Sequence, residues 1–212
     1  MRLGVATGTY GGRSAQERRA ERRERFLAAG LELFGGSPGY RASSVTALCE
    51  AAWLSTRQFY EECRNLEDVL ARLHLLVNDL TEQEVVRALA ESAEAGFEQR
   101  IGAVLRAYVT AATRDRRRLR IAFVEIIGVS EALERQRLVR RARWVELILA
   151  EAGAAAARGE VAPRDYRIAA TAFIGAVNGL LHDWTAGQFE ATLDQVIDEL
   201  AGLLLGVVRP GA

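Results

Sequence analysis

The 212-residue chain contains no lysine, only two cysteines and no long apolar run. Its basic residues are therefore all arginine, whose forked side chains can still grip phosphates, although GC-rich codon usage explains this bias more simply. The two cysteines, Cys49 and Cys63, form no metal-binding pair and suit a reducing compartment. No segment approaches the roughly 18 apolar residues of a membrane span, and the opening residues lack a signal-peptide core. These absences predict a soluble, cytoplasmic protein that does not enter a membrane.

Neither sign of charge is in excess, since 28 basic residues balance 28 acidic ones. This balance argues against a protein that coats nucleic acid without sequence preference. The charges are nevertheless unevenly distributed. Residues 1–64 hold 10 Arg against 7 Glu, whereas residues 65–212 hold 18 Arg against 21 acidic residues. A mildly basic front on a mildly acidic body favours a localised anion-binding surface.

Helical periodicity dominates what is present, and no segment alternates with the period of two that a strand needs. The sequence therefore predicts an all-α protein of about nine helices, with an N-terminal helix-turn-helix domain over residues 16–64. A ligand-binding and dimerisation domain should follow over residues 65–212, and the glycine-rich residues 1–15 should form a flexible arm. The expected helices cover about residues 15–33, 44–52, 55–63, 66–93, 97–114, 116–128, 131–157, 164–185 and 190–208.

Residues 43–63 predict two short helices joined by a tight turn, directly behind an arginine-rich stretch at residues 18–25. Leu48 in the first helix and Phe59 in the second give each helix a buried side. Ser55 is a good N-cap, so Thr56 and Arg57 should lie in the first turn of the second helix. In helix-turn-helix proteins that end of the helix enters the major groove. An ordinary helical hairpin with solvated polar residues would fit these features equally well.

The order of residues favours the DNA-binding interpretation. The run Phe26 to Phe34, then Gly39-Tyr40, Ser43-Ser44-Val45 and Ser55 to Tyr60, resembles the N-terminal domain of the TetR family of transcriptional regulators. This resemblance extends without a gap from about Arg22 to Leu70. Beyond it, only length and the succession of helices agree with the family.

The resemblance implies a role for each DNA-contacting position. Two serines would bind backbone phosphate, three residues of the second helix would read bases, and the nearby aromatic and arginine side chains would touch phosphate. Ser55 would cap that helix. The implied set is Arg41, Ser43, Ser44, Ser55, Thr56, Arg57, Gln58, Tyr60 and Arg64.

Three positions depart from the family's pattern. Trp53 stands where the turn usually has glycine, and a left-handed backbone there would cost roughly 1–2 kcal/mol unless the turn adopts another geometry. Cys63 replaces a larger phenylalanine in the core. Leu66 replaces a phosphate-binding lysine, so either Arg64 takes over that contact or the contact is lost.

The larger domain shows no catalytic motif, and we expect no enzyme activity, no cofactor and no metal site. His74 and His182 fit ordinary surface or core positions. Glu125 lies within an otherwise apolar helix and needs a partner. A structural ion pair with Arg140, Arg141 or Arg143 would satisfy it. Alternatively, Glu125 would orient an apolar ligand in a pocket whose other expected walls are Tyr108, Phe123, Trp144 and Phe173.

The last two expected helices, at residues 164–185 and 190–208, predict a homodimer interface, because small residues line one and apolar residues repeat at helical steps along the other. The function expected from the resemblance is a DNA-binding regulator, a repressor released from a palindromic operator by an unidentified small molecule. The alternative is a helical small-molecule-binding protein whose DNA recognition is weakened or lost.

Overall fold

The computed structural model describes residues 14–208, and every regular element in that range is helical. This confirms the predicted all-α class and its helix-by-helix order. Most of the predicted arm, residues 1–13, lies outside the described residues. The helices are α1 (Ala15–Gly35), α2 (Val45–Ala52), α3 (Thr56–Glu62), α4 (Leu66–Glu91), α5 (Phe97–Thr113), α6 (Arg116–Arg120), α7 (Glu131–Ala157), α8 (Arg167–Thr185) and α9 (Leu193–Val208), with a 3-10 turn η1 (Tyr40–Ala42) and a π-helical segment η2 (Ile121–Glu125).

Short polar residues fix where the helices begin. Ser14 caps α1 through a capping box with Glu17, and Asn65 caps α4 by accepting a hydrogen bond from the backbone of Asp68. The predicted starts of α8 and α9 are each about one turn too early, since α8 begins at Arg167 and α9 at Leu193. The segment expected as one helix over 116–128 is instead a short α6 followed by η2.

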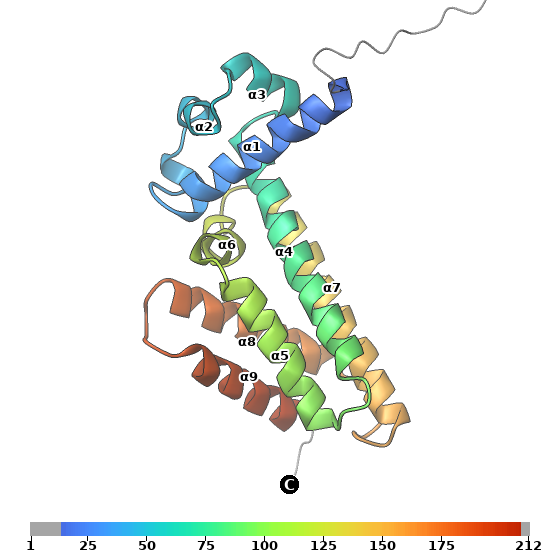
Figure 1. The fold of residues 1–212 in the computed structure, drawn as a ribbon. Coiled ribbons are helices and arrows are strands. Elements are labelled where there is room, and N and C mark those ends of the chain that lie inside the picture. The colour runs from blue at the N-terminus through green and yellow to red at the C-terminus, as the bar shows by residue number, and fades with distance from the viewer. Residues whose placement is uncertain (1–13, 209–212) are drawn as a thin grey trace, which may run out of the picture.

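The helices form a small upper domain and a longer body (Figure 1). α1, α2 and α3 make the upper domain, and α4 leaves it to run down the body beside α7. Hydrogen bonds tie these two helices together in parallel, from Gln136 to His74 near the top and from Trp144 to Asn78 further down. α5, α8 and α9 complete the body, and α6 with η2 lies between the two parts.

Two hydrophobic cores follow this division. The first is centred on Phe26, Phe34 and Phe59, all fully buried, and extends into the upper half of α4. It also takes in Ile121 and Ile126, which belong to the segment between the domains. The first core therefore crosses the boundary at residues 64 and 65 and locks η2 against the upper domain.

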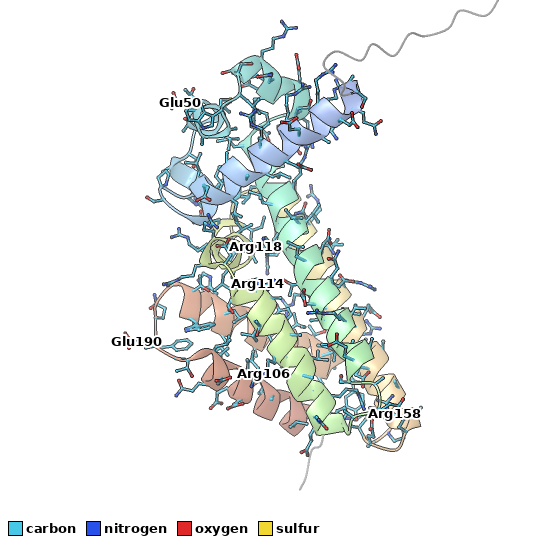
Figure 2. All side chains as sticks on the ribbon, viewed as in Figure 1. Glu50, Arg106, Arg114, Arg118, Arg158 and Glu190 are labelled. Carbon is cyan, nitrogen blue, oxygen red and sulfur yellow. The ribbon has the colours of Figure 1, made fainter. Side chains whose placement is uncertain are left out.

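The second core fills the body between α5, α7, α8 and α9. Charged side chains such as Glu50 on α2 and Glu190 before α9 extend outward from the ribbon (Figure 2). Across residues 14–208, no helix is long and apolar enough to cross a membrane. The core of the body is the larger of the two described cores.

Candidate functional site

The turn between α2 and α3 is a fully hydrogen-bonded helix stop. The backbone N–H of Leu54 donates to Cys49 and that of Trp53 to Glu50, which is the pattern of a Schellman motif. The motif requires a left-handed residue, and Trp53 takes that role with φ 53° and ψ 43°. The turn therefore adopts the left-handed geometry rather than the alternative one. The carbonyl of Trp53 accepts a 2.8 Å hydrogen bond from Arg25 on α1.

Helix α3 presents a polar outer face and an apolar inner one. Thr56, Arg57 and Tyr60 are exposed, and the Arg57 side chain is 89% exposed beside Glu61 on the same helix. Phe59 is fully buried and packs edge-on against the ring of Phe26. The buried face fixes the orientation of α3, so the exposed side chains at its N-terminal end are held outward on a rigid support.

Gln58 is engaged differently from its neighbours. Its side-chain oxygen accepts from the backbone N–H of Ser55 at 2.9 Å and from the Ser55 hydroxyl at 3.1 Å. The Ser55 oxygen in turn accepts from the Gln58 backbone, which completes a capping box. Only the amide NH₂ of Gln58 therefore remains to contact a base.

The remaining predicted DNA contacts flank α2 and the start of α4. Ser44 caps α2 by accepting from Ala47, and the Ser43 hydroxyl donates to the carbonyl of Gly39. Arg64 is exposed just before α4. Arg41 is also exposed, yet it donates to the carbonyl of Gly128 in the body. The structure thus brings Ser44, Thr56 and Arg57 to the two helix N-termini, whereas Arg41 bridges the domains.

The arginine-rich stretch of α1 has a structural role that the sequence did not reveal. The Glu62 side chain is fully buried at the end of α3 and receives Arg22 at 2.6 Å and Arg23 at 2.9 Å, with Arg19 at 3.7 Å. Burial raises the pKa of Glu62, but the hydrogen bonds from Arg22 and Arg23 outweigh it and hold the pKa below its usual value. These arginines tie α1 to α3.

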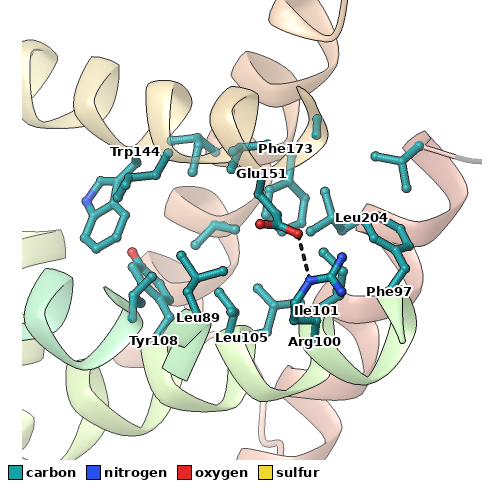
Figure 3. Close-up of a pocket in the computed structure, with 18 residues that line it drawn as sticks. Leu89, Phe97, Arg100, Ile101, Leu105, Tyr108, Trp144, Glu151, Phe173 and Leu204 are labelled. Atoms are coloured by element: carbon teal, nitrogen blue, oxygen red, sulfur yellow. Dashed lines mark hydrogen bonds and ion pairs between the residues drawn. The ribbon is translucent and has the colours of Figure 1, made fainter. Parts of the chain in front are cut away.

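The body encloses an apolar cavity of about 90 Å³ between α4, α5, α7, α8 and α9 (Figure 3). Tyr108, Trp144 and Phe173, three of the predicted ligand contacts, line it together, and the Tyr108 and Trp144 rings pack edge-on with centroids 5.1 Å apart. Its wall also includes Val85, Leu89, Phe97, Ile101, Val104, Leu105, Leu147, Ile148, Ala152, Ile174, Val177, Leu204 and Val208.

One ion pair, between Arg100 and Glu151, forms part of the wall of this apolar cavity. Arg100 is buried on α5 and donates to Glu151 on α7 at 2.8 Å, as the dashed line in Figure 3 shows, and to Glu160 at 2.6 Å. Arg158 bonds the same two carboxylates from outside. A buried guanidinium such as that of Arg100 needs this pairing, and no motif in the sequence predicted it.

A second, smaller cavity of about 60 Å³ lies beside the first and shares Tyr108 and Trp144 with it. Phe123, another predicted ligand contact, lines this smaller cavity rather than the apolar one. His74 lies in its wall; burial first, and then the nearby Arg140 and Arg137, lower the pKa of this imidazole to about 4. His74 is therefore neutral near pH 7, with its Nδ1 3.0 Å from the amide of Gln136.

Glu125 lines neither cavity. Its carboxylate accepts from the backbone N–H of Tyr40 at 3.0 Å and pairs with Arg120 at 2.5 Å. The expected pairing with α7 is wrong: Arg140 and Arg143 bond Asp79 and Glu82 instead, and Arg141 donates to a backbone carbonyl on α8. Glu125 instead joins the body to the loop after α1. The apolar residues around Glu125 indicated that it is buried, but they could not indicate which element packs against it.

Two glycines allow the upper domain to approach the body closely. A Cβ at Gly35 would lie 2.4 Å from the carbonyl oxygen of Arg117 on α6, and Gly39, at φ 91°, lies against the Glu125 carboxylate. On the opposite side of η2, His182 of α8 lies 2.6 Å from the carbonyl of Phe123. The segment η2 therefore contacts the first core, the smaller cavity and α8 at once.

Comparisons with known proteins agree with this geometry. A family model described as "Tetracyclin repressor-like, C-terminal domain" matches residues 94–208, more than half of the chain. No curated protein matches the chain.

Solved structures share the fold at low identity. The fatty acid degradation regulator FadR of Bacillus halodurans has a TM-score of 0.74 at 17% identity, covering 89% of this chain and 96% of that one. FadR of Bacillus subtilis, solved with stearoyl-CoA, has a TM-score of 0.73 at 16% identity, covering 88% and 99%. AibR, solved with isovaleryl coenzyme A and operator DNA, has a TM-score of 0.66 at 21% identity, covering 86% and 97%.

Proposed function

The chain belongs to the tetracycline-repressor-like (TetR) family of transcriptional regulators, and from that premise we propose that it represses transcription by binding a palindromic operator. A small, largely apolar effector releases it from the DNA. In this proposal the protein acts in the cytoplasm as a regulator, not as an enzyme. The observation that carries the proposal is the outer face of α3, where Thr56, Arg57 and Tyr60 are exposed on a helix whose inner face is fully buried.

These side chains suit recognition of a base sequence. Arg57 has its guanidinium free to reach a guanine edge once it leaves Glu61, and Tyr60 offers a hydroxyl to phosphate. Ser44 and Ser43 lie at the start of α2, where backbone amides favour phosphate. We propose Arg41, Ser55 and Arg64 as flanking contacts and the Gln58 NH₂ as a further base contact.

We infer a homodimer formed through α8 and α9. The outward face of α8 carries Ile168, Ala172 and Gly179, which recur at helical spacing, and Ile168 is 86% exposed. Leu203, 44% exposed, continues an apolar surface on α9. Such a surface favours close packing against its own symmetry copy. A dimer would hold two α3 helices at half-sites about 34 Å or a multiple apart.

The effector would occupy the apolar cavity against Tyr108, Trp144 and Phe173, where a flexible hydrocarbon chain fits best. Two proteins of this fold were solved with acyl-coenzyme A ligands, which makes an acyl chain the class of apolar group that we propose. Glu125 stays outside the cavity in this proposal and acts at the junction between the domains.

Release would work through η2. An effector that fills the cavity and displaces Tyr108 or Trp144 would also move Phe123, which lies beside them. Ile121 and Ile126, on either side of Phe123, are packed in the core of the upper domain. Packed cores switch between discrete arrangements rather than deform smoothly. The shift would reorient each α3 and spoil the operator spacing.

Selection of bound sites from a random DNA pool tests the DNA-binding claim. We expect a palindromic consensus, which would establish both sequence preference and two-fold symmetry. Replacing Arg57 with Ala should then weaken binding to that consensus by about 5- to 150-fold, the equivalent of losing a base contact. Arg135→Ala is the matched control, because Arg135 is an exposed arginine on α7 whose one ion pair within residues 14–208 is with Glu131.

Two outcomes would contradict the proposal. The first is an absence of any preferred sequence at physiological salt. The second is an unchanged affinity in the Arg57→Ala variant, which would favour a small-molecule-binding protein that has lost DNA recognition.

A further inference from the structure

The smaller cavity has a positively charged wall. It is lined by three arginines of α7, Arg137, Arg140 and Arg141, and by no carboxylate. The neutral polar side chains of its wall come from α4, α5 and α8. The uncharged lining residues are His74, Asn78, Tyr108, Ala122, Phe123, Ile127, Trp144 and Asn178.

Two of the three arginines are already neutralised. Arg137 bonds Glu134 at 2.6 Å, and Arg140 pairs with Asp79 and Glu82. Arg141 has no carboxylate partner among residues 14–208, and its one hydrogen bond there goes to the backbone carbonyl of Thr171 at 3.1 Å. Arg141 is thus a cation at the cavity wall whose charge the described chain does not balance.

The site also offers uncommitted neutral groups. Neither the Asn178 amide nor the Tyr108 hydroxyl has a hydrogen-bond partner within residues 14–208, although both line the cavity. Gly175 on α8 leaves room for the guanidinium of Arg141, since a Cβ there would lie 3.2 Å from its Nη2. A cation, an amide and a hydroxyl therefore converge on one small space next to the apolar cavity.

We propose that this smaller cavity binds a carboxylate head group, with Arg141 as its counter-ion and Asn178 and Tyr108 as hydrogen-bond donors. The effector is then an amphipathic acid whose hydrocarbon tail fills the apolar cavity through the shared wall of Tyr108 and Trp144. Arginine binds a carboxylate in a two-pronged geometry that suits this position. The inference rests on the proposed effector site and adds the chemical class of its polar end.

The size of the smaller cavity limits which head group can bind, and its position places that head group against η2. A space of about 60 Å³ accommodates a carboxylate and leaves a nucleotide-bearing head outside. The facing wall is Ala122 and Phe123 of η2 together with Ile127 just after it. The charged end of the effector would therefore press on the segment that reaches the core of the upper domain.

Isothermal titration with decanoate, decanol and decanoyl-CoA tests this assignment on the intact protein. Decanoate should bind at least about tenfold more tightly than decanol, which shares its tail but has no charge. Arg141→Gln should abolish that difference and leave decanol binding unchanged. The control Arg135→Gln removes the same charge from an exposed position on α7 and should leave all three affinities as they were.

Other outcomes overturn the proposal. Equal binding of decanoate and decanol would remove the carboxylate from the site. Tighter binding of decanoyl-CoA than of decanoate, unaffected by Arg141→Gln, would assign the head group to another surface. Binding of none of the three would remove the acyl effector as well, whereas the operator selection described above would still report on DNA recognition.

A second inference comes from the turn before α3. Trp53 is 86% exposed and occupies a left-handed conformation that glycine adopts without strain. Its indole has no hydrogen bond and no ring partner among residues 14–208. The strained backbone is thus combined with a large side chain that contributes nothing visible to the fold.

We propose that the Trp53 indole packs on the operator's sugar-phosphate backbone beside the bases read by α3. Trp53 lies two residues before the Ser55 cap and three before the exposed Thr56, and Arg25 anchors its carbonyl. This inference also rests on DNA binding by the chain. It assigns to Trp53 a positioning role that a glycine at the same place would lack.

The substitution Trp53→Gly separates the two properties. It should raise the melting temperature by about 2–4 °C because glycine relieves the left-handed strain. It should also weaken binding to the selected operator by about fivefold or more. Trp53→Phe, which keeps an aromatic ring, should retain most of the affinity. Full operator affinity in a stabilised Trp53→Gly variant would overturn the inference, and failure of the wild type to bind any operator would instead overturn the proposed function.

Discussion

The two cores of the molecule are packed to different degrees. In the first, Phe26, Phe34 and Phe59 are fully buried, and even a methyl group at Gly30 would lie 2.9 Å from Val69. The second contains a cavity of about 90 Å³ at its centre. A close-packed core holds its surface side chains in fixed positions, whereas an open one can rearrange around a guest. The first core is therefore suited to holding α3 for DNA recognition, and the second is suited to binding an effector.

The buried ion pairs of the two regions also differ, in how many alternative partners each charge has. In the upper domain, the single buried carboxylate of Glu62 pairs with three arginines, all of them on α1. In the body, Arg100 holds Glu151 and Glu160, and Arg158 holds both carboxylates as well. Loss of Arg100 would leave both carboxylates of the body paired with Arg158. Loss of Glu62 would leave Arg23 without its buried carboxylate.

Acidification should lower the free energy of unfolding first through His74, in the wall of the smaller cavity. The pKa of His74 is lowered from 6.5 to about 4 in the folded chain, so the unfolded chain takes up a proton that the folded chain refuses. Stability is therefore complete above pH 6.5 and is lost as the pH falls toward 4, by an amount on the order of 3 kcal/mol. Urea unfolding at pH 7 and pH 4.5 measures the loss. His74→Gln should flatten this part of the profile, and an equally steep profile in that variant would contradict the assignment.

Removing the charge of Glu62 should markedly destabilise the upper domain. Glu62→Gln leaves Arg22 and Arg23 without their buried carboxylate, at a cost of about 2–3 kcal/mol, since both arginines keep some exposure to water. The folded pKa of Glu62 is lowered, so its stabilising effect is present above about pH 4.5 and is lost as the pH falls through the lowered pKa. The stability difference between wild type and variant should therefore shrink in strong acid; a constant difference would argue against the ion pair.

The same substitution, Val→Leu, should change the free energy of unfolding in opposite directions in the two cores. Val69→Leu adds a methylene to a packed site and should destabilise by about 1–3 kcal/mol. Val177→Leu adds the same group to the wall of the cavity and should stabilise by about 0.5–2 kcal/mol. Both positions are buried and helical, so helix propensity cancels in the comparison. Chemical denaturation provides the measurement, and equal effects of the same sign would mean that the cores do not differ in packing.

The smallest effect is expected where a charge has a substitute partner. Arg100→Met should cost only about 1 kcal/mol, because Arg158 still pairs with Glu151 and Glu160. The variant should also remove the charged contact with Glu151 from the cavity wall. Thermal unfolding would show the modest loss, and a loss as large as that of Glu62→Gln would remove the contrast between the two regions.

Prediction from sequence succeeded where the signal is local. Helix periodicity, the Ser55 cap and the unusual turn at Trp53 each depend on a few adjacent residues, and the structure has them all. Tyr108 and Trp144, two of the predicted ligand contacts, do line one cavity and pack edge-on, and their contact with a ligand stays a prediction. Contacts between distant segments were not predictable in this way. One partner of Glu125, the backbone N–H of Tyr40, lies 85 residues away, and Arg22 meets Glu62 across 40 residues, because tertiary packing decides such pairs.

The central claim is that the second core, which would bind the effector, and the first core, which supports α3, are coupled through η2. The most direct test is a fluorescence anisotropy titration of the selected operator with the dimer, with and without saturating decanoate. Coupling predicts that the effector weakens operator binding by about 5- to 150-fold. Superimposable titration curves, with effector occupancy confirmed in the same samples, would contradict it.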